Sequence, residues 1–122
     1  NACCILLSTR LGGGVQRHWT ALLRNSKGVF FFDSLDLKAV TLSKILEDDG
    51  KFVRFLKSVG ANMVNKKLQQ SHKMVRTCGL HVVVRVFCWQ MSNAQYLQYL
   101  LSATNCVSPD KLVALMTIIG HL

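Results

Sequence analysis

The chain has 122 residues, half of them apolar, and a net charge of +9. A chain of this length and composition can bury one hydrophobic core without disulfides or a metal, so we expect a single domain over residues 1–122. The longest apolar runs, residues 82–84 and 113–119, are much shorter than the roughly 20 residues that a membrane-spanning helix needs. These numbers exclude a membrane-spanning protein and a disulfide-rich miniature scaffold.

The cysteines favour a reducing compartment. There are five of them, an odd number, Cys3 and Cys4 are adjacent, and no apolar segment follows a basic start as in a secretory signal. We therefore expect reduced thiols, and a protein of the cytoplasm or nucleus that is not secreted. The first residue is Asn1 rather than Met, which is compatible with a processed product that lacks an N-terminal segment.

The positive charge is concentrated in the second half of the chain. Residues 51–122 carry nine Lys or Arg against Asp110 alone, a net charge of +8, whereas residues 1–50 carry a net charge of +1. The basic segment, in which His72 also lies, comprises Lys57, Lys66, Lys67, Lys73 and Arg76. Such a cluster attracts phosphates or an acidic surface, so the segment is a candidate nucleic-acid interface; the alternative is a solvated face that keeps the protein in solution.

Strands are predicted first along the chain. Residues 3–9 (CCILLST) have the composition of a buried strand, and residues 11–16 (LGGGVQ) are expected to form a loop. No Gly-Lys-Ser/Thr follows these glycines, so the loop is not a phosphate-binding loop. Residues 18–23 and 29–35 are strand-like and flank the turn-rich residues 24–28, a pattern that predicts a β-hairpin.

Helices dominate the rest. We expect helices over residues 41–49, capped by Thr41 or Ser43, and over residues 51–59, closed by Gly60, with a short strand within residues 61–65. Two further helices are expected over residues 92–103 and 108–122, the last with Ser108 as its N-cap and Pro109 at its first position. The predicted class is α+β, with a small mixed or antiparallel sheet packed on helices.

Residues 76–89 (RTCGLHVVVRVFCW) have conflicting signals. Three consecutive valines favour a strand. Apolar residues at positions 80, 83, 84, 87 and 88 nevertheless follow a helical stripe, with Thr77 available as a cap and Gly79 in the first turn. We predict a helix, which places Cys78 at its N-terminus.

The predicted hairpin brings a histidine and a carboxylate together. A turn centred between Asn25 and Ser26 places His18 directly opposite Asp33, where the Cβ atoms of a cross-strand pair lie about 4.5–5.5 Å apart. Shifting the turn centre by one residue moves the pair two positions out of register, still within reach of a hydrogen bond. A carboxylate beside an imidazole fixes its tautomer and makes it a better base. A solvated His–Asp pair at the strand ends is the alternative.

Cys78 has three interpretations. At a helix N-terminus the free N–H groups and the helix dipole favour the thiolate, which makes a nucleophile near neutral pH, and a protonated His18 would lower the thiol pKa further. Free cysteines are also common as small buried apolar side chains. With His81, Cys78 forms half of a zinc site, but the sequence offers no second pair of ligands at close spacing. We therefore expect no metal.

Four segments in order resemble a known family. HWTALL (residues 18–23), FFFDSL (30–35), QQ (69–70) and TCGLHV (77–82) resemble the His-Trp, Asp/Glu, Gln, Cys-Gly order of the adenain-like cysteine proteases. This family includes adenovirus endopeptidase and relatives in large DNA viruses and Maverick/Polinton elements, and it shares the order with the SUMO-specific proteases. The resemblance covers about residues 4–90. The CGL sequence and the small size are more similar to the viral branch.

The resemblance implies roles for individual residues. His18 would be the general base, Asp33 the acid that orients it, and Cys78 the nucleophile. Gln70 is similar to the glutamine whose amide completes an oxyanion hole with the Cys78 backbone N–H, and Gln69 is the competing residue. Trp19 is similar to an indole that narrows the substrate cleft beside the catalytic histidine, and Gly79 would line the same cleft. On strand alternation alone, Trp19 points away from His18, so a core position is the alternative.

The resemblance also implies a function. It implies a monomeric thiol endopeptidase that cleaves after small residues, glycine above all, in precursor proteins of the virion, acting in the virion and in the host nucleus or cytoplasm. No cofactor is needed for the chemistry, but adenoviral members are activated by DNA and by a disulfide-linked peptide. The resemblance thus implies a DNA or peptide activator, although no cysteine lies between Cys4 and Cys78 for a disulfide tether at the family's position. The alternatives are a SUMO-type deconjugating isopeptidase and a non-catalytic domain that binds nucleic acid through the basic segment.

Overall fold

The computed structural model describes residues 1–11, 14–64, 66–69, 77–103 and 108–120. The strands are β1 (Ala2–Leu11), β2 (Gly14–Asn25), β3 (Gly28–Phe32) and β4 (Asn62–Met63). The helices are α1 (Ala39–Leu46), α2 (Lys51–Ser58), α3 (Cys78–Phe87), α4 (Asn93–Ser102) and α5 (Pro109–Gly120). The predicted α+β class is confirmed, with strands first and helices after them. Among the described helices, none has the length and apolar character needed to cross a membrane.

The strands form one mixed sheet in the order β1-β2-β3-β4. The first three strands pair in antiparallel fashion, and β4 adds in parallel to β3 through Phe30–Asn62 and Phe31–Met63. β1 pairs with β2 along its whole length, whereas β3 pairs with β2 from Ala21 to Asn25. The part of β2 that precedes Ala21 therefore extends beyond the end of β3.

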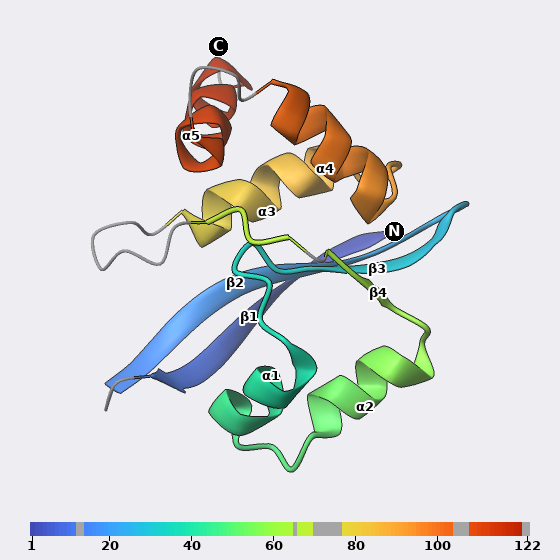
Figure 1. Ribbon diagram of the computed structural model, residues 1–122, viewed down its shortest axis with the longest axis vertical. Helices are drawn as coiled ribbons and strands as arrows, with labels where there is room; N and C mark the ends of the chain where they lie inside the picture. The colour runs from blue at the N-terminus through green and yellow to red at the C-terminus, as the bar shows by residue number, and fades with distance from the viewer. Residues whose placement is uncertain (12–13, 65, 70–76, 104–107, 121–122) are drawn as a thin grey trace.

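Helices cover both faces of the sheet (Figure 1). Helices α3, α4 and α5 lie over one face and α1 and α2 over the other. The strand alternation explains the two cores, because Phe30 and Phe32 pack among side chains of α3, α4 and α5, whereas Phe31 packs against α1 and α2. The site described below lies where the first turn of α3 meets β2.

The turn of the β2–β3 hairpin lies one residue later than the sequence predicts. Asn25 pairs with Gly28, so Ser26 and Lys27 form a two-residue turn and Ala21 lies opposite Phe32. Gly28 has φ of 137°, a conformation that side chains disfavour, and the Asn25 side chain accepts a hydrogen bond from the Lys27 N–H at 2.8 Å. This local chemistry fixes the turn centre between Ser26 and Lys27 and corrects the predicted register.

The same turn is attached to the segment that follows α3. The Asn25 side-chain amide donates to the carbonyls of Trp89 and Met91 at 2.8 and 3.1 Å, and the Lys27 ammonium donates to the Gln90 carbonyl at 2.9 Å. The hairpin tip is therefore connected to the C-terminal end of α3.

Residues 78–87 are helical as predicted, and not a strand. In α3 the buried side chains are His81, Val82, Val84 and Arg85. These four positions share one face of a helix, whereas in a strand they would be divided between two faces. Thr77 precedes the helix as expected, but its side chain makes no capping hydrogen bond. Its backbone, with φ of −105° and ψ of 8°, lies outside the extended region that a capping residue adopts.

Arg85 is a fully buried cation without a carboxylate partner among the described contacts. Its guanidinium donates to the Asn93 side-chain oxygen and to the carbonyls of Cys88 and Met91, and it lies 5.1 Å from the centre of the Tyr96 ring. The Asn93 amide then donates to the carbonyls of Phe31 and Asn62, which belong to the parallel strands β3 and β4. Burial lowers the pKa of Arg85.

The other predicted boundaries are partly wrong. Residues 11 and 14–16, which were expected in a loop, belong to strands, because β1 continues to Leu11 and β2 begins at Gly14. Helix α1 begins after Lys38 rather than at a Thr41 or Ser43 cap, and it ends at Leu46 because Glu47 is left-handed with φ of 52°. Ser108 is the N-cap of α5 as predicted, since its hydroxyl accepts from the Lys111 N–H.

Candidate active site

His18 and Asp33 are in contact, as the hairpin predicts. β3 ends at Phe32, so Asp33 follows directly after the strand, and the ring of His18 reaches it diagonally across the shifted register. The His18 Nε2 lies 2.6 Å from the Asp33 Oδ1, and both side chains are buried. The alternative of a solvated pair is therefore wrong.

Backbone N–H groups hold the carboxylate of Asp33 in place. The N–H of Leu35 donates to Oδ1 at 2.9 Å, and the N–H of Leu37 donates to Oδ2 at 3.1 Å. The chain turns sharply here, with Asp36 left-handed at φ of 52°. Because both carboxylate oxygens are fixed by the backbone, the orientation of the His18 ring is fixed as well. Because Nε2 is the ring nitrogen that contacts Asp33, Nδ1 is the nitrogen that this carboxylate does not use.

Cys78 is the first residue of α3 and its thiol is half-buried. A hydrogen bond from His18 is the largest cause that lowers the pKa of Cys78; burial opposes it, and the backbone N–H groups of Trp19 and Gly79 add to it. The N–H of Trp19 can reach the sulfur because this part of β2 extends beyond β3.

The pKa of His18 changes in the opposite direction to that of Cys78. Burial would lower its pKa, but the hydrogen bonds with Asp33 and Cys78 and their charges outweigh this and raise the pKa of His18 to about 9. A lowered thiol pKa and a raised imidazole pKa in contact favour a thiolate–imidazolium pair at neutral pH. Cys88, by contrast, has its thiol pKa raised by burial.

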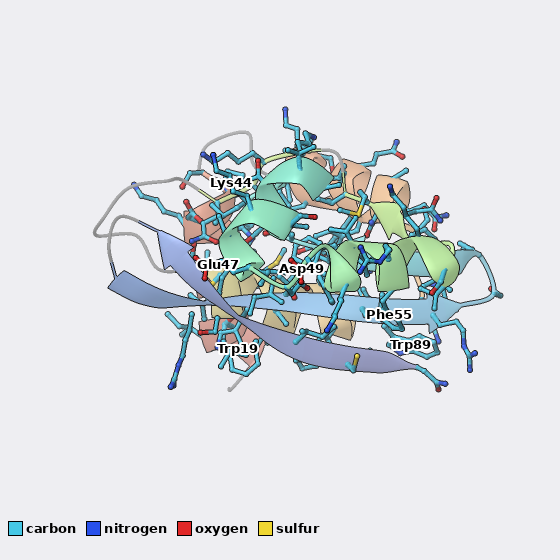
Figure 2. All side chains as sticks on the ribbon, turned by 90° about the horizontal axis from the view of Figure 1, so that it is seen from below. Trp19, Lys44, Glu47, Asp49, Phe55 and Trp89 are labelled. Carbon is cyan, nitrogen blue, oxygen red and sulfur yellow. The ribbon has the colours of Figure 1, made fainter. Side chains whose placement is uncertain are left out.

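Trp19 lies at the surface of the site rather than in the core. Its side chain is 40% exposed, and Figure 2 shows it at the margin of the molecule. A Cβ added to Gly79 would lie 3.5 Å from the indole Cδ1, so the ring covers the first turn of α3 next to Cys78. Ala21 and Leu23, which alternate with Trp19 along β2, pack in one core with side chains of α3, so Trp19 lies on the α3 side of the strand.

Of the two glutamines, the structure describes Gln69. Its side chain is buried, and its amide oxygen accepts a hydrogen bond from the Ser34 hydroxyl at 2.8 Å. The Ser34 carbonyl also accepts from the N–H groups of Leu68 and Gln69 at 2.8 and 2.9 Å. Ser34, which the sequence analysis did not single out, follows Asp33 in the chain. Its hydrogen bonds thus hold Gln69 close to the Asp33 backbone. Gln70 lies outside the described residues.

The basic segment is described in part. Lys57, on α2, and Lys66 and Lys67, between β4 and α3, have exposed side chains. Lys73 and Arg76 lie outside the described residues. Nucleic-acid binding by the basic segment stays a prediction.

Cys78 and His81 do not share a site. His18 is the group that lowers the pKa of the Cys78 thiol most, whereas the His81 Nε2 lies 2.8 Å from the Asp110 Oδ1. Over the described part of the chain, no three His, Cys, Asp or Glu side chains are grouped so that they could hold a metal ion.

Sequence reasoning missed a second buried His–carboxylate pair, His81 with Asp110. The Thr77 hydroxyl also donates to Asp110 Oδ1. The signal available in the sequence was that Asp110 is the lone acidic residue in a half of the chain that carries nine cations. Carboxylates are rarely buried unless paired, so a lone acidic residue among so many cations is a candidate for a specific partner.

Comparison of the chain with known protein families, with curated proteins and with solved structures finds no match.

Proposed function

We propose that the protein is a cysteine endopeptidase in which Cys78 is the nucleophile, His18 the general acid and base, and Asp33 the orienting carboxylate. The observation that carries the proposal is the buried contact of His18 Nε2 with Asp33 Oδ1 at 2.6 Å, beside a Cys78 thiol whose pKa is lowered chiefly by its interaction with His18. A nucleophile, a base and a third group that orients the base are the parts that acyl transfer by a thiol requires.

The reaction would proceed through a thioester. The Cys78 thiolate adds to the carbonyl carbon of the scissile peptide, and the His18 imidazolium gives its proton to the leaving amine. Water, deprotonated by His18, then releases the acyl group and restores the thiol. The N–H groups of the first turn of α3 would stabilise the tetrahedral oxyanion, and Thr77 does not occupy them, because its side chain makes no cap.

A glutamine amide would complete the oxyanion hole. Gln69 supports this role among the described residues, because Ser34 binds its amide oxygen and so leaves the NH₂ group as the donor. Gln70, favoured by the resemblance to the adenain-like family, is the other candidate. Substrates of this class would be precursor polypeptides of a DNA virus, with glycine before the scissile bond and with DNA as an activator. Cleavage of a folded SUMO-like modifier is the alternative.

The first prediction concerns covalent labelling. A peptide with an electrophilic carbon in place of the scissile carbonyl is expected to label Cys78 faster than Cys3, Cys4, Cys88 or Cys106, because Cys78 combines a helix N-terminus with a protonated imidazole. Mass spectrometry of the digested protein identifies the labelled thiol, and hydrolysis of a fluorogenic peptide measures turnover. Cys78→Ala should abolish both signals, whereas Cys88→Ala should change neither. Equal labelling of all five thiols would refute the proposed nucleophile.

The second prediction concerns selectivity. If the Trp19 indole covers the cleft beside Cys78, a methyl group on the residue before the cut costs about 1–3 kcal/mol, or roughly ten- to two-hundred-fold in kcat/KM. A peptide with Gly at this position should therefore exceed its Ala counterpart by that factor, and Trp19→Ala should reduce the difference. Trp89→Ala, which removes another exposed indole, is the matched control. Equal turnover of the Gly and Ala peptides by the unaltered protein would count against this role of Trp19.

A further inference from the structure

A ring of hydrogen bonds closes around the first turn of α3. The Thr77 carbonyl accepts from the His81 N–H at 2.9 Å, which closes the turn through the backbone. The Thr77 hydroxyl and the His81 Nε2 both bond to one atom, the Oδ1 of Asp110, on α5. Cys78, Gly79 and Leu80 lie between the two anchored residues, so the ring encloses the turn that carries the nucleophile.

Asp110, the shared acceptor in this ring, is itself held in place on α5. Asp110 is the second residue of α5, where the helix dipole favours a negative charge, and Ser108 caps the same helix through the Lys111 N–H. Leu112 and Val113 follow in α5 and are buried in the core shared with Val82 and Val84 of α3. The carboxylate is therefore held against α3 by packing as well as by its hydrogen bonds.

The ring also explains why Thr77 does not cap α3. A threonine before a helix usually accepts a hydrogen bond from an N–H of the first turn. Here donation to Asp110 holds the Thr77 hydroxyl on α5, and because the Thr77 backbone is not extended, the oxygen accepts no hydrogen bond from the turn. The N–H groups of the turn thus stay available, and that of Gly79 contributes to the lowered pKa of Cys78.

We propose that Thr77, His81 and Asp110 are positioning residues that hold the Cys78 turn in its reactive geometry and keep its N–H groups free for the thiolate and the oxyanion. This inference rests on the proposed function, because it assigns the cluster to the same nucleophile. None of the three residues needs to touch the substrate. They act by fixing Cys78, and a misplacement of about 1 Å at a reacting atom can cost on the order of 100-fold in rate.

The experiment compares variants that remove the ring with variants that keep it. Thr77→Val removes a donor of the ring, and Asp110→Ala removes the shared acceptor. The conservative variants keep these groups, because Thr77→Ser retains the hydroxyl and Asp110→Asn retains an Oδ1 acceptor. Thr117→Val is the matched control, because the Thr117 hydroxyl bonds within α5 to the Val113 carbonyl and not to α3. Each variant is checked by circular dichroism, and Cys78 alkylation by iodoacetamide and peptide hydrolysis are followed against pH.

We expect Thr77→Val and Asp110→Ala to lower kcat by about 10- to 100-fold with little change in KM, and to move the pH midpoint of Cys78 alkylation upward. The double variant should be no worse than the more affected single variant, because both remove one ring. Thr77→Ser, Asp110→Asn and Thr117→Val should stay within about threefold of the unaltered protein, well inside that loss.

Two outcomes separate the inference from the proposed function. If folded Thr77→Val and Asp110→Ala proteins keep the unaltered alkylation profile, or if Asp110→Asn is as damaged as Asp110→Ala, the positioning role is wrong. If the unaltered protein cleaves no peptide, the proposed function fails, but the alkylation profiles still decide whether the ring controls Cys78.

Discussion

His18→Ala is expected to lower kcat/KM for peptide cleavage by about 10²- to 10⁴-fold, the range that a positioned general acid and base contributes. On the proposed mechanism the variant loses the proton donor for the leaving amine, and it also loses the largest cause that lowers the pKa of Cys78. Alkylation of Cys78 should therefore need a higher pH than in the unaltered protein. Peptide hydrolysis measures the loss in kcat/KM. The rate of iodoacetamide alkylation as a function of pH measures the change at Cys78.

The pH dependence of the unaltered protein follows from the same pair. The raised pKa of His18, about 9, means that the imidazolium is present below that pH and is lost above it. The thiolate forms at a pH below the ordinary range of a cysteine. Activity should thus rise through the Cys78 titration, remain high through neutral pH and fall near pH 9. Stability contributed by the charged imidazole is complete below its unfolded pKa of 6.5 and is lost as the pH rises through about 9.

The matched control for His18→Ala is His81→Gln, which removes an imidazole that contacts Asp110 and not Cys78 directly. The His81→Gln protein should still lose activity near pH 9, because its His18 is intact. This pH limit should hold even if the rate of peptide cleavage is lower at every pH. An unchanged pH profile of Cys78 alkylation in His18→Ala would show that the imidazole does not control the thiol.

Asn93→Ala is expected to lower the free energy of unfolding by about 3 kcal/mol or more. Asn93 accepts from the buried Arg85 guanidinium and donates to the carbonyls of Phe31 and Asn62. A hydrogen bond to a charged group contributes about 1.5–3 kcal/mol, and a buried group left without its partner costs more than an exposed one. Urea unfolding followed by circular dichroism measures the change.

Two further variants define the cause of that loss. Gln98→Ala, at an exposed position of the same helix, should change the free energy of unfolding by less than about 0.5 kcal/mol. Arg85→Met combined with Asn93→Leu should recover part of the stability, since removing both partners leaves no buried cation unpaired. The recovery is partial because the carbonyls of Phe31 and Asn62 still lose their donor. An Asn93→Ala protein as stable as the unaltered one would contradict the role of this network.

Local patterns were sufficient for the parts of the site that lie close in sequence. The hairpin composition brought His18 to Asp33 even though the predicted turn was one residue early, because a histidine side chain also reaches a diagonal partner. The helical stripe placed Cys78 at the start of α3 despite three valines. In both cases one supersecondary unit determines the position of the side chain.

The parts that were missed depend on the packing of distant elements. Asp110 is 29 residues from His81 and meets it because α5 packs on α3, which no local period specifies. Arginine is rarely buried without a paired charge, so the burial of Arg85 could not be predicted before Asn93 and the carbonyls after α3 were seen beside it.

The hairpin turn has a consequence for the fidelity of folding. A slip of one residue in a strand would move His18 to the opposite face of the sheet, away from Asp33. The same slip would displace Asn25 and Lys27 by about 3.3 Å from the carbonyls of Trp89, Gln90 and Met91. The segment after α3 binds the hairpin turn, and the start of α3 lies beside His18 and Trp19 of β2. Contacts at both ends of the helix therefore depend on the same register of β2. A misregistered hairpin would therefore fail to dock on α3, so the docking of α3 favours the native register while the chain folds.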